Sequence, residues 1–148
     1  MAKTIITALF ILFTASVSSP ILAQDDVIEK RQKAMKSNSA DVKAIKAAVE
    51  GKDYATIETK AKDIMGTAEK IPSLFPKGST TGKTKATPAI WEKSDEFAKL
   101  AKSLSKASGE LAAAAKSKDD AAIAVKLKEV GETCSSCHKP FRAEKYPE

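Results

Sequence analysis

The chain has 148 residues, with 25 Lys and Arg against 19 Asp and Glu, and its formal net charge is +6. This length suffices for one domain around a single hydrophobic core. Because the lysines alternate with acidic residues along the chain, they indicate solvated helix faces rather than a nucleic-acid-binding patch, and we expect no nucleic-acid partner.

Residues 1–23 are predicted to form a secretory signal peptide. Lys3 precedes a mostly apolar run from Ile5 to Val17, and the stretch ends in Ala23 before two acidic residues. The run is shorter than the roughly 20 apolar residues that span a bilayer. Cleavage after Ala23 therefore predicts a mature domain of residues 24–148, with an uncleaved membrane anchor as the alternative.

Apolar residues then recur with helical spacing. Seven-residue intervals predict a first helix that ends at Gly51. Its inward residues are Ile28, Met35, Val42 and Val49, with Ile45 between them. Asp53 is the predicted N-cap of a second helix, whose apolar seam runs from Tyr54 to Ile71. Proline and glycine break the pattern from Pro72 to Pro88 and predict a surface loop.

Two more helices are predicted after this loop. Thr87 is expected to cap the third, and Ser117 with Asp120 resembles a capping box that opens the fourth. The inward residues of the third helix are Ile90, Phe97, Leu104 and Leu111, and those of the fourth are Ile123, Leu127, Val130, Cys134, Cys137 and Phe141. Four amphipathic helices without strand-like alternation predict an all-α, antiparallel up-down-up-down four-helix bundle that holds a cofactor between its helices.

The motif that carries chemistry lies in the fourth helix, at Cys134-Ser135-Ser136-Cys137-His138. Two thiols at this spacing can add across the two vinyl groups of one haem, and His138 can then ligate the iron. Residues three and four apart share a helix face, so the three side chains point toward the same porphyrin. The motif predicts a c-type cytochrome with one covalently bound haem c.

Two competing interpretations of the cysteines are weaker. A structural zinc site needs four ligands, whereas the chain has only two cysteines and one histidine. A thioredoxin-like dithiol needs a nearby strand-helix-strand pattern, which the sequence lacks. Attachment through thioethers also requires reduced thiols outside the cytoplasm, so the motif and the signal peptide together predict a periplasmic protein. We expect no stable membrane association after cleavage.

The mature region resembles the class II c-type cytochromes, also called the cytochrome c-prime family. The resemblance rests on the C-terminal Cys-x-x-Cys-His followed by Phe141-Arg142, on Arg31-Gln32, on Gly51-x-Asp53-Tyr54 and on Pro88-x-Ile90-Trp91. Class I cytochromes usually carry the haem motif near the N-terminus instead.

Within this family, the residue four positions after the first-helix arginine separates two functions. High-spin cytochromes c-prime have a non-ligating apolar residue there, which leaves the iron five-coordinate and open to small gases. Low-spin cytochromes c-556 have methionine there as the second axial ligand. This sequence has Met35, so the resemblance implies iron held by His138 and Met35. In the alternative, Met35 is a flexible residue that only fills the core. Met65 is the rival candidate for the second axial ligand.

Arg31 and Arg142 are the candidate partners of the haem propionates. Arg31 and Asn38 fall in register with Met35 on an otherwise apolar stripe, where a charge requires a partner. Arg31 resembles the family arginine that approaches the propionates, and Arg142 follows His138 by one turn. The alternative for each arginine is a long side chain that reaches out to water.

The sequence therefore predicts a monohaem electron carrier that works with redox proteins, with a mild preference for acidic ones. It shows no nucleophile with its base and no proton-transfer constellation, so we expect no enzyme. The alternative function is a five-coordinate cytochrome c-prime that binds NO or CO. The resemblance also allows a homodimer. Trp91 and Phe141 are expected to pack in the core or against the haem edge.

Overall fold

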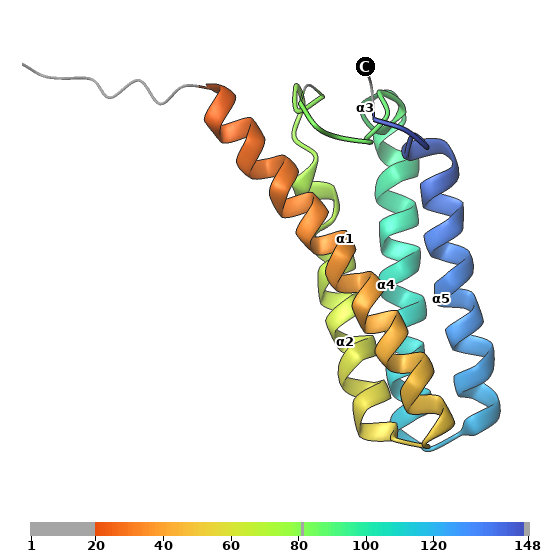
Figure 1. Ribbon diagram of the computed structural model, residues 1–148. Coiled ribbons are helices and arrows are strands. Elements are labelled where there is room, and N and C mark those ends of the chain that lie inside the picture. The colour runs from red at the N-terminus through yellow and green to blue at the C-terminus, as the bar shows by residue number, and fades with distance from the viewer. Residues whose placement is uncertain (1–19, 81, 147–148) are drawn as a thin grey trace, which may run out of the picture.

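The computed structural model describes residues 20–80 and 82–146, with side chains from residue 26 onward. The helices are α1 (Pro20–Glu50), α2 (Tyr54–Lys70), the short 3-10 helix η1 (Pro72–Leu74), α3 (Ala89–Glu92), α4 (Ser94–Lys116) and α5 (Asp120–Phe141). The four long helices run alternately up and down (Figure 1). Among the described residues there is no strand, and the only β-pairing is an isolated bridge between Ala86 and Arg142. The predicted all-α bundle is confirmed.

The first turn of the bundle forms as the sequence predicts. Helix α1 ends at Glu50, and Lys52 takes a positive φ of 52° in the turn. The Asp53 carboxylate then accepts a hydrogen bond from the Thr56 backbone N–H at 3.1 Å. This bond satisfies one of the free N–H groups at the start of α2.

The predicted starts of the last two helices are wrong. Asp119 rather than Ser117 caps α5, because the Ser117 hydroxyl still donates to the Ala113 carbonyl at the end of α4. The Thr87 hydroxyl caps no helix and donates instead to the Pro140 carbonyl at 3.0 Å. The third helix is also divided, since Lys93 (φ −121°, ψ 47°) separates α3 from α4.

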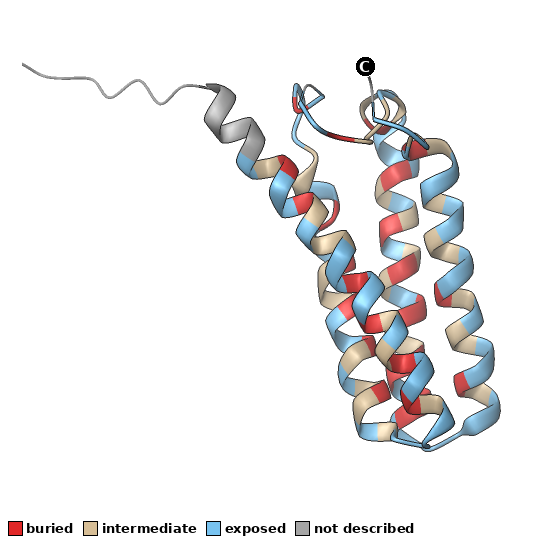
Figure 2. Ribbon diagram, viewed as in Figure 1, coloured by how far each residue is buried: buried red, intermediate tan, exposed pale blue. Residues whose placement is uncertain are grey.

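The hydrophobic core lies on the inward faces of the helices, as Figure 2 shows. Its largest fully buried apolar side chains come from all four long helices: Ile45, Ile57, Ile64, Leu111, Ile123 and Val130. Burying one aliphatic side chain of this size stabilises the fold by roughly 1.5–3 kcal/mol. Small buried residues of α4, such as Ala101 and Ala115, allow close packing between the helices.

Aromatic side chains close the end of the bundle at which α5 finishes. Phe75 packs edge-on against Phe97 with 4.9 Å between ring centroids, and Phe97 packs edge-on against Phe141 at 5.3 Å. The Trp91 indole N–H donates to the backbone carbonyls of Phe75 and Pro76. Phe141 is buried in the core and the half-buried Trp91 packs against it, which agrees with the expectation that these residues pack in the core or against the haem edge.

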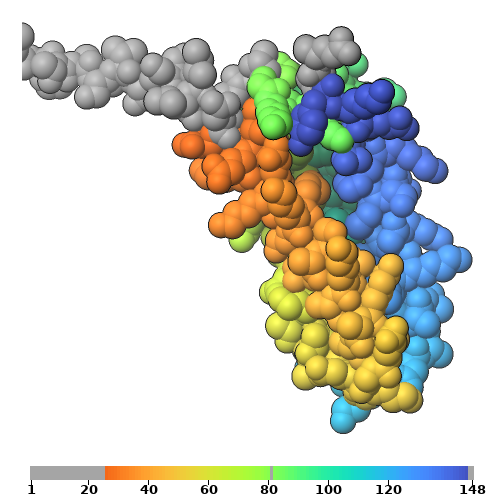
Figure 3. Space-filling view, viewed as in Figure 1, coloured from red at the N-terminus to blue at the C-terminus, as the bar shows by residue number. Residues whose placement is uncertain are grey.

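One side of the bundle is open. Helix α1 packs on α2, α2 on α4 and α4 on α5, but among the described residues no Cα of α1 lies within 8 Å of a Cα of α5. In the space-filling view, the surface is hollowed between these two helices (Figure 3). The described helices include none long and apolar enough to cross a membrane.

Candidate haem-binding site

Two cavities occupy the open side between α1 and α5. The loop-side cavity, of about 310 Å³, is lined by residues such as Phe75, Lys85 and Arg142. The helix-side cavity, of about 330 Å³, is lined by residues such as Asn38, Val42 and Leu104. Both are lined by the same three side chains, Met35, Cys137 and His138, so they form one continuous region.

The haem motif reaches this region because its residues share one face of α5. Cys134 and Cys137 are half-buried, carry free thiols and pack against the hydrophobic core. Cys134 lines the helix-side cavity, and His138 lies exposed at the margin of both cavities. Met35 comes from α1, across the opening, and is half-buried. The structure thus brings together the four side chains that the sequence predicts for attachment and ligation.

The two thiols are unsuited to thiolate chemistry. Burial raises the pKa of Cys134, and burial together with the neighbouring Cys134 raises the pKa of Cys137 to about 11. Both groups are therefore neutral thiols at neutral pH, whereas redox-active dithiols have lowered pKa values. Among the described residues, no cluster of three or more His, Cys, Asp or Glu side chains could hold a metal ion. The raised pKa values do not fit a redox-active dithiol, and the lack of such a cluster among the described residues does not fit a zinc site.

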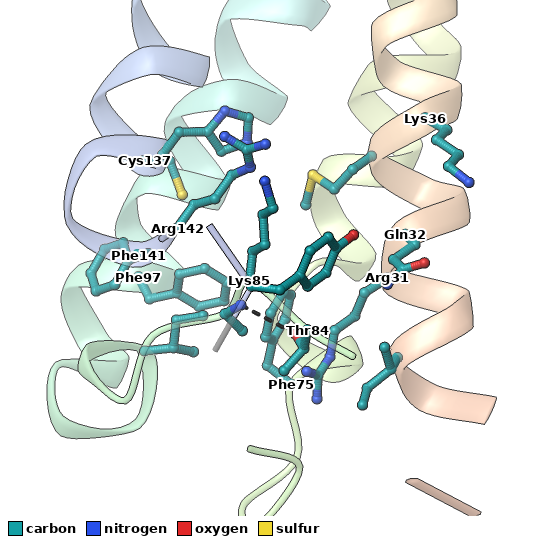
Figure 4. Close-up of a pocket in the computed structure, with 16 residues that line it drawn as sticks. Arg31, Gln32, Lys36, Phe75, Thr84, Lys85, Phe97, Cys137, Phe141 and Arg142 are labelled. Carbon is teal, nitrogen blue, oxygen red and sulfur yellow. Dashed lines mark hydrogen bonds between the residues drawn. The ribbon is translucent and has the colours of Figure 1, made fainter. Parts of the chain in front are cut away.

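His138 is set up as a neutral imidazole. Partial burial against the cavity wall and the positive charge of Arg142 both lower the pKa of His138. A neutral imidazole has a free ring nitrogen, which is the form that ligates metals. Arg142 is itself exposed, lines the loop-side cavity and lies next to the haem motif in Figure 4.

The two methionines of the described region have different surroundings. Met35 lines both cavities. Met65 lines neither of them and packs between α2 and α4, where its sulfur lies 3.2 Å from the position a Cβ would take on Gly109. Met65 is therefore a packing residue at the α2–α4 contact, and Met35 is the methionine at the site.

Arg31 is buried in the wall of the loop-side cavity, with 3% of its surface exposed. Its Nε donates to the Leu74 carbonyl at 2.5 Å, its Nη1 donates to the Ser79 carbonyl at 3.0 Å, and its Nη2 donates to the Ser79 hydroxyl. The guanidinium also lies 4.4 Å from the centre of the Phe75 ring. The alternative in which Arg31 reaches out to water is wrong, because these contacts hold the side chain inside.

The positive charge of Arg31 has no carboxylate partner among the described residues. Burial lowers the pKa of Arg31 through desolvation alone. A buried cation without a counter-ion is costly. A haem propionate in the adjoining cavity would supply the missing negative charge, so the geometry fits the predicted role of Arg31.

The sequence did not reveal the part of the site formed by the loop and the C-terminal tail. Thr84, Lys85 and Tyr146 line the loop-side cavity. The Ala143 N–H donates to the Lys85 carbonyl at 2.8 Å, and the Lys85 ammonium donates to the Glu144 carbonyl at 2.6 Å. These contacts join irregular segments that are far apart in sequence, and neither segment has a periodic pattern from which the pairing could be predicted.

The residues present fit a covalent haem. Two neutral thiols at the required spacing, a neutral imidazole, a thioether and an unpaired cation surround one region that opens between two helices. In addition, the Asn38 Oδ1 is buried at the helix-side cavity without a hydrogen-bond partner. An unpaired buried acceptor beside a cavity is expected where a ligand completes the structure.

The comparisons with known proteins agree with this site. The family model described as Cytochrome C' matches residues 26–142. A cytochrome c' of Rhodopseudomonas palustris is 36% identical over 132 residues, which cover 84% of this chain and 86% of that protein. A cytochrome c-556 of Agrobacterium fabrum is 35% identical over 147 residues, which cover 97% of each chain.

Solved structures share the fold. Cytochrome c' from Thermochromatium tepidum superposes with a TM-score of 0.76 at 28% identity and covers 82% of this chain and 97% of that chain. Another cytochrome c', described as having a ligand-controlled dimer dissociation, superposes with a TM-score of 0.75 at 27% identity, with the same coverage. The resemblance noted in the sequence is confirmed, and the chain belongs to the cytochrome c' family.

Proposed function

We propose that this cytochrome is a periplasmic electron carrier in which His138 and Met35 are the two axial ligands of the haem iron. Cytochromes of this family bind haem c covalently and transfer electrons. The observation that carries the assignment of the ligands is that Met35 on α1 and His138 on α5 line the same two cavities from opposite sides of the opening.

Five residues of the chain have defined tasks at this site. Cys134 and Cys137 fix the cofactor through thioether bonds, His138 and Met35 offer a nitrogen and a sulfur donor, and Arg31 neutralises a propionate. When bound, the haem iron supplies a one-electron couple between ferric and ferrous states. Helices α1 and α5 hold the two donor side chains in place on a packed bundle, which keeps structural change between the two states small.

The proposal excludes catalysis. No carboxylate lines either cavity, and the residues around them offer no acid–base pair and no activated nucleophile. This supports electron transfer to other redox proteins as the function. We also propose no nucleic-acid partner, because the lysines alternate with acidic residues along the sequence, and no stable association with a membrane after cleavage of the signal peptide.

The periplasmic location rests on the predicted signal peptide. Residues 1–19 lie outside the described residues, and the predicted cleavage point after Ala23 falls near the start of α1. The proposal also includes a homodimer, by analogy with the relative described by its dimer dissociation.

A gas-binding cytochrome c' with five-coordinate iron is the second candidate. Met35 is only half-buried and adjoins two cavities, so its side chain has space into which it could move away from the iron. Relatives named cytochrome c' are also as similar to this chain as those named cytochrome c-556.

Absorption spectra of two matched variants test the assignment. The wild-type protein should be six-coordinate and low-spin, with sharp α and β bands when reduced and a sulfur-to-iron charge-transfer band in the far red when oxidised. Met35→Leu nearly conserves volume and should give a high-spin, CO-accessible site. Met65→Leu should leave the spectrum unchanged. A high-spin wild-type spectrum with rapid CO uptake would instead favour the gas-binding candidate.

A further inference from the structure

Cationic side chains surround the opening between α1 and α5. Lys36, Lys43 and Lys46 come from α1, Lys85 from the loop and Arg142 from the end of α5, and all five line one of the two cavities. We call these five residues the cationic rim. The three α1 lysines and Arg142 are exposed. The lysines lie on one face of α1, because residues spaced by three and seven positions align on a helix.

The charges of the rim are not compensated by the protein. No carboxylate lines either cavity, and none of the five residues forms an ion pair with a described carboxylate. Some lysines elsewhere are paired, as in Lys60 with Asp41 at 3.1 Å and Lys126 with Glu110 at 2.8 Å. Others, such as Lys99 and Lys102, form no ion pair within the described residues. The rim therefore differs from the rest of the surface in its position, because its cations gather around an opening that no described carboxylate lines.

The cofactor cannot neutralise the whole rim. A haem has two propionates, and the buried Arg31 already faces the loop-side cavity as a partner for one of them. In Figure 4, Lys36 extends from α1 away from the other labelled side chains of the cavity. Lys43 and Lys46 adjoin only the helix-side cavity. An excess of positive charge thus remains beside the opening in which the cofactor would lie.

We propose that the cationic rim is the docking surface for an acidic redox protein. This inference rests on the proposed electron-carrier function and names the class of its partner. The five cations stand on three separate segments around the opening in which the cofactor would lie, so a negatively charged protein that docks on them comes close to the cofactor, as electron transfer requires. One electron crosses the interface in each encounter, the partner is oxidised as the cytochrome is reduced or the reverse, and no bond forms or breaks.

Electrostatic steering gives this proposal a measurable consequence. Complementary charge around a redox site raises the rate of productive encounter by about 10- to 1,000-fold at low ionic strength, and salt removes the advantage. The holoprotein and an acidic plastocyanin, used as the probe, should therefore exchange electrons in a strongly salt-dependent reaction.

Two double variants with the same change in net charge separate the effect of where the charges lie from the effect of net charge itself. Lys36→Glu/Lys43→Glu alters the rim, whereas Lys99→Glu/Lys102→Glu makes the same change at exposed lysines of α4 that line neither cavity. At low salt, the rim variant should lose about tenfold in second-order rate constant, and the control less than about twofold. The two should converge near 1 M salt, where charges are screened within about 3 Å. Equal losses, or no loss, would overturn the proposal.

Nuclear magnetic resonance locates the surface independently. Titration of the ¹⁵N-labelled holoprotein with redox-inactive, zinc-substituted plastocyanin should shift amide signals of residues 36–46, 85 and 142. Shifts confined to α2 and α4 would overturn the proposal. Sedimentation with phosphatidylglycerol vesicles would also overturn the proposal if it depended on Lys36 and Lys43 while the rim variant kept wild-type electron-transfer rates. The rim would then be a membrane-binding surface.

The electron-carrier function is checked separately in the same samples. The low-spin spectrum of both double variants should match the wild type, since neither variant replaces an iron ligand. Their reduction potentials are measured as well, and the rates are compared after correction for the driving force, because Lys36 and Lys43 line the cavities. A matching spectrum without a rate difference removes the docking surface and leaves the electron carrier intact. A high-spin wild-type spectrum removes the electron carrier, whatever the rates show.

Discussion

At the scale of single residues, Arg31 links the first helix to the loop beside the haem site. Its guanidinium donates to backbone carbonyls of Leu74 and Ser79 and lies against the Phe75 ring. The sequence predicted a charge that needs a partner at this position. It could not predict the carbonyl partners, because they belong to an irregular loop more than 40 residues away along the chain.

Replacing this side chain should loosen the loop. Arg31→Met keeps the apolar stem and removes charge-assisted hydrogen bonds, each of which contributes about 1.5–3 kcal/mol. We expect the free energy of unfolding of the holoprotein to fall by roughly 2 kcal/mol in urea denaturation. This is less than the sum of the three bonds, because the substitution also removes the cost of burying a charge. Gln32→Ala is the control, since Gln32 makes only an exposed hydrogen bond to the Lys83 carbonyl, and it should change stability by less than about 0.5 kcal/mol. Equal effects of the two substitutions would contradict the structural role of Arg31.

At the scale of helices, apolar periodicity was sufficient to predict the number and order of the long elements. The Asp53 cap was predicted correctly because its carboxylate acts within three residues. The Asp119 cap and the break at Lys93 were missed, because they depend on where α4 ends and on how α3 meets the loop. The haem motif was predictable from its own spacing, whereas the loop residues around it were not.

The end of the bundle at which α5 starts provides a pH-dependent contact between helices. Asp120 at the start of α5 accepts hydrogen bonds from Lys52 at 2.7 Å and from Tyr54 at 2.9 Å. These two bonds hold the pKa of Asp120 below its usual value, with Lys52 the larger cause. A lowered carboxyl pKa stabilises the fold above the unfolded pKa of about 3.9, and this stabilisation is lost as pH falls through the folded pKa.

Asp120→Asn should therefore reduce stability at neutral pH but not in acid. Urea denaturation at a series of pH values should show a wild-type advantage at pH 7 that shrinks as the pH falls below about 4. Asp95→Asn, which removes an exposed carboxylate that makes no ion pair within the described region, should show no such trend. An advantage that stays constant down to acid pH would contradict an ionic role for Asp120.

At the scale of the whole molecule, the fold separates a packed core from an open side. Helices α2 and α4 join α1 to α5, and the two outer helices leave room for a cofactor between them. The sequence predicted which residues face inward, and the ligand pair Met35 and His138 implied a cofactor between the first and last helices. Apolar spacing alone does not predict that α1 and α5 stay apart, because an apolar stripe packs equally well against a helix or against a porphyrin. The same opening concentrates the cationic rim on one face.

Export to the periplasm makes a prediction for the mature chain. If residues 1–23 are a cleaved signal peptide, intact-mass and N-terminal analysis of the periplasmic protein should place its first residue at Gln24 or within a few residues of it. The observed mass should also include one covalently bound haem. Recovery of the full-length chain in the membrane fraction would contradict the signal-peptide prediction.

Labelling of the methionine methyl groups with ¹³C tests whether the Met35 sulfur binds the haem iron opposite His138. The chain has three methionines, at positions 1, 35 and 65, and cleavage would remove the first. In the reduced holoprotein, the ring current of the porphyrin should shift one methyl signal far upfield. If Met35 is the ligand, this signal should disappear in Met35→Leu and persist in Met65→Leu. A wild-type protein with no upfield methyl signal, or one whose signal survives Met35→Leu, would contradict ligation by Met35.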